Sequence, residues 1–460
     1  MSPLARWSSC VPSVTLYPRN QNLIHRLPIP SKRAISACTT SGQSNASHSP
    51  EMKPPFKWVT VWAPTPQPTE EADMPSYPFR GVAFHNTTIR QTLRVTASGD
   101  FIRIRLSNLF GSETLHISRA VIAVARPHNS VAPGGSPSIL QETAQQVLFD
   151  GEQPTSVPGG SYVVSDSLKF PIKAGQVLSI TIFLQKGHHS QQITSHPGSR
   201  TDSWLCHGDQ SMISELSGPD LQSSTHWYFL SGVEMCLGTA HHGTLVLLGD
   251  SITDGRCSTD NANNRWPDLL FDRMQQHPFA QNISIINQAV GGGRVLRDGK
   301  GPSLLSRLDR DAIAQPSRRY ILVFHGVNDI GTADSDPACC QEVTKALKKA
   351  YSQIVSRCHA HGLHVLGATI GPMGGNEPYG TCELRERARQ DVNDWIRTSG
   401  VFDAVVDFDY VLRSTQDNSR LKEEYDSGDH LHPNVAAFKA MAAAFPLDIF
   451  EQFDLAETSG

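Results

Sequence analysis

Short runs in which apolar and polar residues alternate fill much of the first half of the chain. Residues 101–106 alternate strictly, with their aliphatic side chains on one face, and residues 178–182 repeat the pattern. Residues 115–125 follow it loosely, and turn-rich stretches at 127–138 and 151–160 separate the runs. A period of two residues is typical of half-buried strands. Short strands at this spacing predict an all-β sandwich or jelly roll.

Apolar and amphipathic segments take turns in the second half. Five apolar segments have the length of buried strands: residues 244–248, 283–286, 320–324, 363–370 and 404–408. Segments with a helical period lie between and after them: residues 266–274, 302–314, 340–359, 383–398 and a closing helix that starts at Pro433. This alternation predicts a parallel sheet flanked by helices, and therefore an α/β domain.

A chain of 460 residues is too long for one ordinary domain. We predict a disordered or targeting tail at residues 1–55, a β-sandwich (jelly-roll-like) accessory domain at 56–240 and the α/β domain at 241–455. The first 50 residues contain no acidic residue and several arginines, as mitochondrial transit peptides do. Prolines interrupt any amphipathic helix there, so a disordered tail and a true start at Met52 remain alternatives.

Composition narrows the classes of function. The net charge of −4 gives no reason to expect nucleic-acid binding. No apolar run approaches the roughly 18–20 residues of a transmembrane segment, and no secretory signal core is visible. We therefore expect a soluble protein, cytoplasmic or mitochondrial by sequence. No cluster has metal-site spacing and no dinucleotide fingerprint occurs, so neither metal nor cofactor is expected. Two cysteine pairs remain candidate bridges, Cys206 with Cys236 and Cys340 with Cys382.

A serine with potential for nucleophilic chemistry follows the first predicted strand of the α/β domain. Ser251 stands in Gly-Asp-Ser at the carboxyl end of residues 244–248, the edge at which α/β sheets bind ligands. A serine needs a base and a group that orients the base. Asp429 and His432 lie three residues apart before the closing helix, so the carboxylate can hold one imidazole nitrogen while the other faces the serine. His430 is expected to be exposed, and the alternatives are that it lines the cleft or competes with His432 for Asp429.

Two further segments offer hydrogen-bond donors for a developing oxyanion. A glycine run after the strand at 283–286 exposes backbone N–H groups, and Asn328 follows the strand at 320–324 with a side-chain amide. Within the run we favour Gly292, although Gly291 and Gly293 leave the register open by one residue.

These four segments, in this order, resemble the SGNH (GDSL) hydrolase family: residues 249–251, 287–292, 326–329 and 429–433. The resemblance covers about residues 244–445 and implies a three-layer α/β/α, flavodoxin-like fold. It implies Ser251 as nucleophile, His432 as base and Asp429 as its orienting group. The implied oxyanion donors are the N–H groups of Ser251 and Gly292 and the side chain of Asn328.

The β domain is similar, around residues 105–111, to a β domain found in front of some GDSL-type esterases. The family resemblance also implies an extracellular location. For the β domain itself, a carbohydrate-binding module, a wall of the substrate cleft and a purely structural partner remain alternatives. Trp204 and Trp227 are either sugar-stacking platforms or buried residues.

Several polar residues near the predicted site have a structural interpretation. Asp254 and Arg294 either steer a polar substrate or form a structural ion pair, and we expect the ion pair. Asp309 and Asp311 are expected to be solvated, and His325 to be packed.

The function expected is that of a serine esterase for carboxylic esters, with short acyl or acetyl esters of carbohydrates or small metabolites as substrates. An acyltransferase of specialised metabolism and a carbohydrate-binding protein with an inactive hydrolase scaffold are the alternatives. The expected partner is a small-molecule or carbohydrate ester. The sequence leaves the oligomeric state open.

Overall fold

The computed structural model describes residues 57–127, 132–238 and 240–459. The predicted tail at residues 1–55 lies outside this part of the chain. Among the helices of the described residues, none combines the length and the apolar character that crossing a membrane requires.

Residues 57–237 form an antiparallel region, called here the β region. A five-stranded sheet has the order β1-β16-β4-β10, with β9 also paired to β4. Its strands are β1 (Lys57–Trp62), β4 (Gly99–Ser107), β9 (Tyr162–Val164), β10 (Leu168–Ile172) and β16 (Leu230–Leu237). A six-stranded sheet has the order β14-β13-β3-β11-β6-β7. Its strands are β3 (Thr87–Arg94), β6 (Arg119–Val124), β7 (Gln145–Gln146), β11 (Val177–Leu184), β13 (Ser203–His207) and β14 (Gln222–Ser224).

Smaller elements complete the β region. Two short sheets contain β2 (Gln67–Pro68), β12 (Thr194–His196) and β15 (Trp227–Tyr228), and β5 (Leu115–Ile117) with β8 (Thr155–Val157). Two 3-10 turns are η1 (Glu71–Asp73) and η2 (Gln141–Thr143). The strand expected loosely at residues 115–125 is thus divided, since β5 pairs with β8 and β6 pairs with β11.

The core of the β region lies between the two larger sheets. Ile102, Ile104 and Leu106 of β4 are buried, as their alternation predicts, and they share one apolar cluster with Ile180 and Ile182 of β11. Because inward-facing side chains of both sheets fill one core, the predicted all-β sandwich is confirmed.

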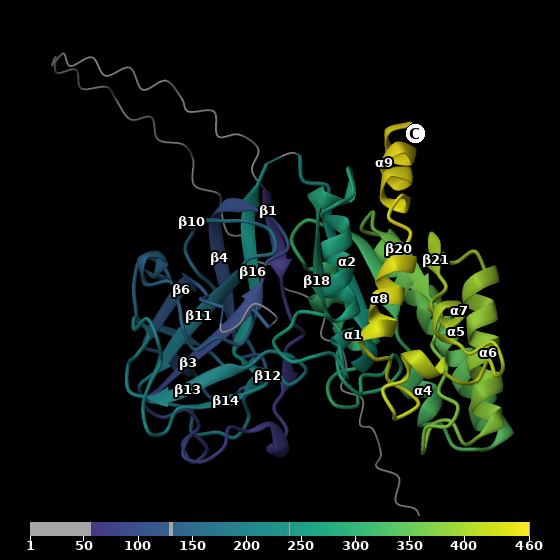
Figure 1. Ribbon diagram of the computed structural model, residues 1–460, viewed down its shortest axis with the longest axis horizontal. Coiled ribbons are helices and arrows are strands. Elements are labelled where there is room, and N and C mark those ends of the chain that lie inside the picture. Colours follow the sequence, from purple (N-terminus) through teal and green to yellow (C-terminus); the bar gives the residue numbers. More distant parts are fainter. Residues whose placement is uncertain (1–56, 128–131, 239, 460) are drawn as a thin grey trace, which may run out of the picture. The chain divides into compact units, whose positions relative to one another are not determined.

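Residues 243–459 form the α/β region, coloured from teal through green to yellow in Figure 1. It is built on a parallel sheet of order β18-β17-β19-β20-β21. Its strands are β17 (Gly243–Gly249), β18 (Ile283–Asn287), β19 (Arg318–Phe324), β20 (His364–Ala368) and β21 (Ala404–Val406). In chain order this is 2-1-3-4-5, the flavodoxin-like arrangement. The strand order reverses between β17 and β19, which is where such folds bind ligands.

Helices cover both faces of this sheet. They are α1 (Ser251–Asp254), α2 (Trp266–Met274), α3 (Leu304–Leu308), α4 (Val327–Gly331), α5 (Pro337–His359), α6 (Glu383–Thr398), α7 (Phe408–Leu412), α8 (Val435–Ala444) and α9 (Ile449–Ser459), with short turns η3 (Ala280–Asn282), η4 (Asp309–Ile313) and η5 (Glu423–Tyr425). Leu245 and Leu247 of β17 belong to the apolar cluster that contains residues of α2 and α8, whereas Val246 and Leu248 belong to the cluster that contains residues of α5 and α6. The expected three layers are therefore confirmed.

Some predicted boundaries were wrong for local reasons. The strand expected at 404–408 ends at Val406, because the Asp407 side chain accepts a hydrogen bond from the Tyr410 N–H and starts α7. The helix expected at 302–314 starts at Leu304 and continues as a π turn at η4. Helix α9 was not predicted.

The burial of one aspartate and the state of four cysteines differ from the sequence-based expectations. Asp311 was expected to be solvated, but it is buried and forms an ion pair with Arg307 at 3.0 Å, whereas Asp309 is exposed and pairs with Arg357. The cysteines of both candidate bridges, Cys206 with Cys236 and Cys340 with Cys382, are free thiols.

Buried hydrogen bonds join the β region to the α/β region. The Gln288 side chain donates to the carbonyl of Ala63 and accepts from the hydroxyl of Thr65, both at 3.0 Å. The Thr96 hydroxyl donates to the carbonyl of Ile285 in β18, also at 3.0 Å. The two regions therefore share buried polar groups.

Candidate active site

Ser251 lies at the point where the strand order of the parallel sheet reverses. It follows β17 as the first residue of α1, and the side chain of Asp250 caps this turn by accepting the Ile252 N–H at 3.1 Å. No room exists for a side chain at Gly249, since a Cβ there would lie 2.5 Å from the Thr253 hydroxyl. The N–H of a first helical residue has no partner within the helix, so that of Ser251 is free for a ligand.

Ser251, His432 and Asp429 form a continuous chain of hydrogen bonds. Ser251 Oγ lies 2.7 Å from His432 Nε2, and His432 Nδ1 lies 2.6 Å from Asp429 Oδ2. Asp429 Oδ1 also accepts the backbone N–H of His432 at 2.8 Å, which fixes the carboxylate in place. A proton on Nδ1 is held by the carboxylate, which leaves the lone pair of Nε2 directed at the serine hydroxyl.

The electrostatics of this chain favour a neutral imidazole beside an ionised carboxylate. Burial acts to raise the pKa of Asp429, but hydrogen bonds from His432 outweigh it and lower that pKa to about 2. Burial lowers the pKa of His432, and Arg256 and Arg200 lower it further, against the raising effect of Asp429. At neutral pH the imidazole is therefore able to accept a proton.

The glycine run presents one free N–H group to the cleft. The Gly291 N–H donates to Asp254 Oδ2 at 3.0 Å, and the Gly293 N–H donates to the carbonyl of Val290 at 2.9 Å. The Gly292 N–H has no acceptor among the described residues, and Gly292 lines the cleft with a φ of +70°. These bonds favour Gly292 as the donor within the run.

The amide of Asn328 is held in one orientation beside this loop. Its Nδ2 donates to the Gly293 carbonyl at 2.8 Å, and its Oδ1 accepts from the Tyr379 hydroxyl at 3.0 Å. An amide nitrogen carries two hydrogens, so one remains for a ligand in the cleft that Asn328 lines. Tyr379 was not expected from the sequence.

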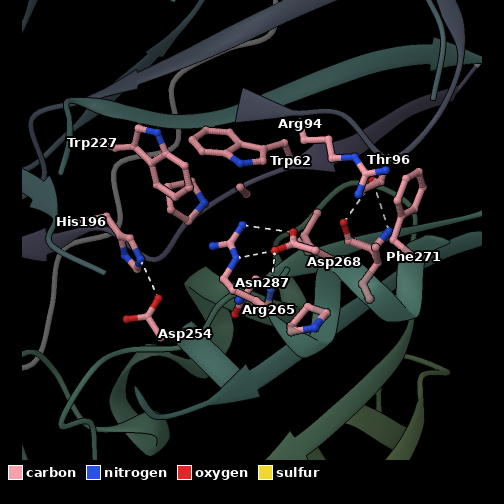
Figure 2. Close-up of a pocket in the computed structure, with 15 residues that line it drawn as sticks. Trp62, Arg94, Thr96, His196, Trp227, Asp254, Arg265, Asp268, Phe271 and Asn287 are labelled. Carbon is pink, nitrogen blue, oxygen red and sulfur yellow. Dashed lines mark hydrogen bonds and ion pairs between the residues drawn. The ribbon is translucent and has the colours of Figure 1, made fainter. Parts of the chain in front are cut away.

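Asp254 links the glycine run to the β region rather than to Arg294. Its Oδ1 lies 2.9 Å from His196 Nε2, and both side chains are buried (Figure 2). The other ring nitrogen of His196 lies 2.9 Å from the carbonyl of Thr65. The expected ion pair between Asp254 and Arg294 was wrong, since Arg294 donates to the Asp298 carbonyl instead.

Next to this link, the two regions enclose a small pocket of about 40 Å³ (Figure 2). Trp227 lines it, is 3% exposed and packs edge-on against Trp62 with ring centroids 4.8 Å apart. Trp227 is therefore one of the buried tryptophans and not a sugar-stacking platform. Trp204 is partly exposed, and its indole N–H donates to the Gly135 carbonyl.

The cleft above Ser251 has a volume of about 370 Å³ and takes residues from both regions. The β region contributes Gln67, Glu70, Asp73, Pro197, Gly198 and Arg200. The α/β region contributes Ser251, Asp254, Arg256, Gly291, Gly292, Lys300, Asn328, Tyr379, Leu431 and His432. The β region thus forms one wall of the cleft, and most of the lining is polar.

Two histidines and one cluster of possible metal ligands take no part in the proposed catalysis. His430 is exposed and pairs with Asp426, so it does not compete for Asp429. His325 is packed, as expected, and neither ring nitrogen has a hydrogen-bond partner among the described residues. Asp334, Asp336 and Cys339 can bring ligand atoms within 4.8 Å of one another, but they do not line the cleft, and Asp336 already caps α5.

Comparison with known proteins agrees with this architecture. Residues 247–440 match the GDSL-like lipase/acylhydrolase family. The α/β region belongs to that family, and the protein is a carboxylic ester hydrolase. No curated protein matches the chain in a sequence search.

Solved structures of the same kind cover less than half of the chain. A lipolytic protein of the G-D-S-L family from Desulfitobacterium hafniense is 19% identical over 44% of this chain and 97% of its own, with a TM-score of 0.33. Axe2, an acetylxylan esterase from Geobacillus stearothermophilus, is 19% identical over 45% of this chain and 94% of its own, with a TM-score of 0.34.

Proposed function

We propose that this protein is a serine esterase that transfers short acyl groups from polar alcohols to water, with Ser251, His432 and Asp429 as its catalytic residues. The observation that carries the proposal is the hydrogen-bond chain from Ser251 Oγ through the imidazole to Asp429. Small metabolites and carbohydrates are the alcohols that such a polar cleft suits.

The reaction begins when His432 Nε2 takes the proton of Ser251 as its Oγ attacks the ester carbonyl. The oxyanion accepts hydrogen bonds from the N–H groups of Ser251 and Gly292 and from Nδ2 of Asn328. The intermediate then collapses as the imidazolium protonates the leaving alcohol, and an acyl-serine remains. His432 next deprotonates a water molecule, which attacks the acyl-serine. The imidazolium then returns this proton to Ser251 Oγ as the carboxylic acid is released. No step calls for a cofactor.

The lining of the cleft argues for a short acyl group. Leu431 is the one branched aliphatic side chain among the residues that line it. Because each buried methylene of a long acyl chain gains only where apolar surface covers it, acetyl esters are expected to react with a higher kcat/KM than octanoyl or longer esters.

Replacing Ser251 by alanine tests the proposal. With 4-nitrophenyl acetate, Ser251→Ala is expected to lower kcat by at least about 10⁴-fold, since losing a catalytic serine leaves only binding and the oxyanion donors. Ser352→Ala, on helix α5, is the matched control and should retain the activity of the wild type. Equal background rates in the wild type and Ser251→Ala would favour the inactive-scaffold alternative.

Acyl transfer to an alcohol would use the same acyl-serine. Product analysis with an added alcohol acceptor separates the two reactions, because a transferase gives the new ester whereas an esterase gives the free acid.

A further inference from the structure

The charged side chains that line the cleft divide into paired and unpaired groups. Glu70 has a cation beside it, since Lys300 Nζ lies 3.6 Å from its carboxylate. Asp73 lies 3.2 Å from His226 Nε2. Asp254, which also lines the cleft, is bonded to His196 and to the Gly291 N–H. Each acidic side chain of the cleft lining therefore already has a partner within the protein.

The two arginines of the cleft are not engaged in this way. Neither Arg200 nor Arg256 has a side-chain hydrogen bond or an ion pair with any described residue. The Nε atom of Arg200 is buried and has no acceptor. Because both guanidinium groups line the cleft without such a partner, an anion that enters it can accept hydrogen bonds from their accessible N–H groups. Arg256 is exposed and free to meet the same anion.

Arg200 is held in place by its backbone. Its φ is +50°, a region that residues other than glycine seldom occupy, and its carbonyl accepts the Asn261 N–H at 2.9 Å. The chain thus fixes the position from which this side chain reaches the cleft, while the guanidinium itself is left without a protein partner.

Both guanidinium groups line the cleft together with Ser251 and His432. The acyl group of the proposed substrate is short and uncharged, so it offers the arginines no charge to bind. A charge that binds the arginines therefore belongs to the alcohol portion of the ester, whose leaving oxygen takes its proton from His432 Nε2.

We propose that the alcohol portion of the substrate carries a carboxylate, which Arg200 and Arg256 bind together. This assignment rests on the proposed esterase function and names its substrate class as acyl esters of hydroxy acids, acylated sugar acids among them. The planar guanidinium group of an arginine can donate two parallel N–H hydrogen bonds to one carboxylate, which the ammonium group of a lysine cannot do. The β region would then contribute to specificity through Arg200.

A matched pair of esters tests the assignment. 4-Acetoxybenzoate and 4-acetoxybenzamide release the same acetyl group and differ in one charge. The ratio of their kcat/KM values, charged over neutral, is expected to fall about tenfold in Arg200→Gln and in Arg256→Gln, and further in the double variant, mainly through KM. Arg126→Gln removes an exposed arginine that does not line the cleft, and its ratio should equal that of the wild type.

One further variant and the exposure of Arg256 control for misfolding as the cause. Arg200→Lys keeps the charge and should recover only part of the ratio, because the two parallel N–H donors are lost. Arg256 is exposed, so Arg256→Gln is expected to fold normally. The proposal is overturned if the ratio is the same in the wild type and in the double variant, or if 4-acetoxyphenyl phosphate is preferred over the carboxylate.

A binding measurement separates this proposal from the esterase proposal. Calorimetry of 4-acetoxybenzoate with Ser251→Ala should show binding that weakens about tenfold when Arg256→Gln is added. If no ester is hydrolysed above the rate of Ser251→Ala, the esterase proposal fails, and the calorimetry still decides the anion site. No binding to Ser251→Ala would overturn the anion site alone.

Discussion

Tyr379 acts on Asn328 through a single hydrogen bond. Its hydroxyl donates to Asn328 Oδ1, so a flipped amide would place its nitrogen against this hydroxyl and its oxygen against the carbonyl of Gly293. Burial raises the pKa of Tyr379, which keeps the hydroxyl protonated at neutral pH. Tyr379 is therefore a positioning residue for the proposed oxyanion donor.

Replacing Tyr379 by phenylalanine should lower kcat by about 3- to 10-fold, the worth of one neutral hydrogen bond, with little change in KM. The reason is that Asn328 then samples orientations that do not serve the oxyanion. Steady-state kinetics with a neutral acetyl ester measure the effect. Tyr410→Phe, at a position 68% exposed, is the control. An unchanged kcat in Tyr379→Phe would contradict the positioning role.

The activity should depend on pH through His432. Only the neutral imidazole accepts the serine proton, so kcat/KM for a neutral ester rises with pH through the pKa of His432 in the free enzyme. Burial lowers that pKa from the usual value of a histidine, and Arg256 and Arg200 oppose Asp429 in setting it. The midpoint of the acidic limb is therefore expected on the acidic side of the usual histidine pKa, with a flat profile through neutral pH.

Arg256→Gln supplies the matching variant for this profile. It removes a positive charge that lowers the pKa of His432, so the acidic limb should move to higher pH, while Arg126→Gln should leave it in place. A limb that moves to lower pH in Arg256→Gln would contradict this account.

Short sequence blocks located the proposed catalytic residues because each block carries its own local geometry. A strand that ends in Gly-Asp-Ser, and an aspartate three residues before a histidine, place their side chains without knowledge of the fold. His196, Tyr379 and Arg200 carry no such signal. His196 meets Asp254 from 58 residues away, and Tyr379 meets Asn328 from 51 residues away, so only the folded chain shows these partners.

At the scale of elements, the start of α8 determines the position of the His432 loop. Asn434 caps the helix by accepting the N–H groups of Ala436 and Ala437, at 2.9 and 3.1 Å. The same side chain donates to the carbonyls of Glu424 and Asp426 on the other side of the loop, at 2.9 and 3.0 Å. One amide thus joins a helix cap to the segment that carries Asp429 and His432.

Asn434→Ala should lower the free energy of unfolding by about 1–2 kcal/mol, because a helix cap is lost. It should also lower kcat several-fold, because the loop loses two anchors. Asp336→Ala removes the cap of α5, which does not carry any of the proposed catalytic residues. It should destabilise the protein to a similar degree with kcat unchanged. Denaturant titration measures the stability of the two variants, and steady-state kinetics measure their kcat. An equal loss of kcat in Asn434→Ala and Asp336→Ala would refute the anchoring role.

The helices α2 and α6 were predicted to the residue, because an amphipathic period and a proline at the start of α2 mark them in the sequence. The predicted helix and strand boundaries that were wrong depend on side-chain caps or on partners far away in the sequence. The π turn at η4 includes Asp311, which pairs locally with Arg307, but Arg307 itself is buried against Gln288 and Thr65, 19 and 242 residues away.

At the scale of the whole molecule, Arg307 shows how closely the two regions are joined. Its buried guanidinium donates to the Gln288 carbonyl at 2.7 Å and to the hydroxyl of Thr65 in the β region at 3.3 Å. Separating the regions would remove the Thr65 hydroxyl from Arg307 and both side-chain partners of Gln288, at a cost of about 1–3 kcal/mol for each polar group left unpaired.

The described regions should therefore unfold together. Calorimetry of the full-length protein is expected to show one thermal transition, with a calorimetric enthalpy equal to the van't Hoff enthalpy. Two separate transitions, one for each region, would show that the shared polar contacts do not couple them.

The bond between His196 and Asp254 limits how this enzyme can be rebuilt. A chimaera that carries the hydrolytic half on a foreign binding module would lose the imidazole, and Asp254 would keep only the Gly291 N–H as a partner. The loop that carries the Gly292 donor would then be held by the Asp254 carboxylate, which lacks one of its two hydrogen bonds. Module swapping in this architecture must therefore supply a replacement donor, or accept a slower enzyme.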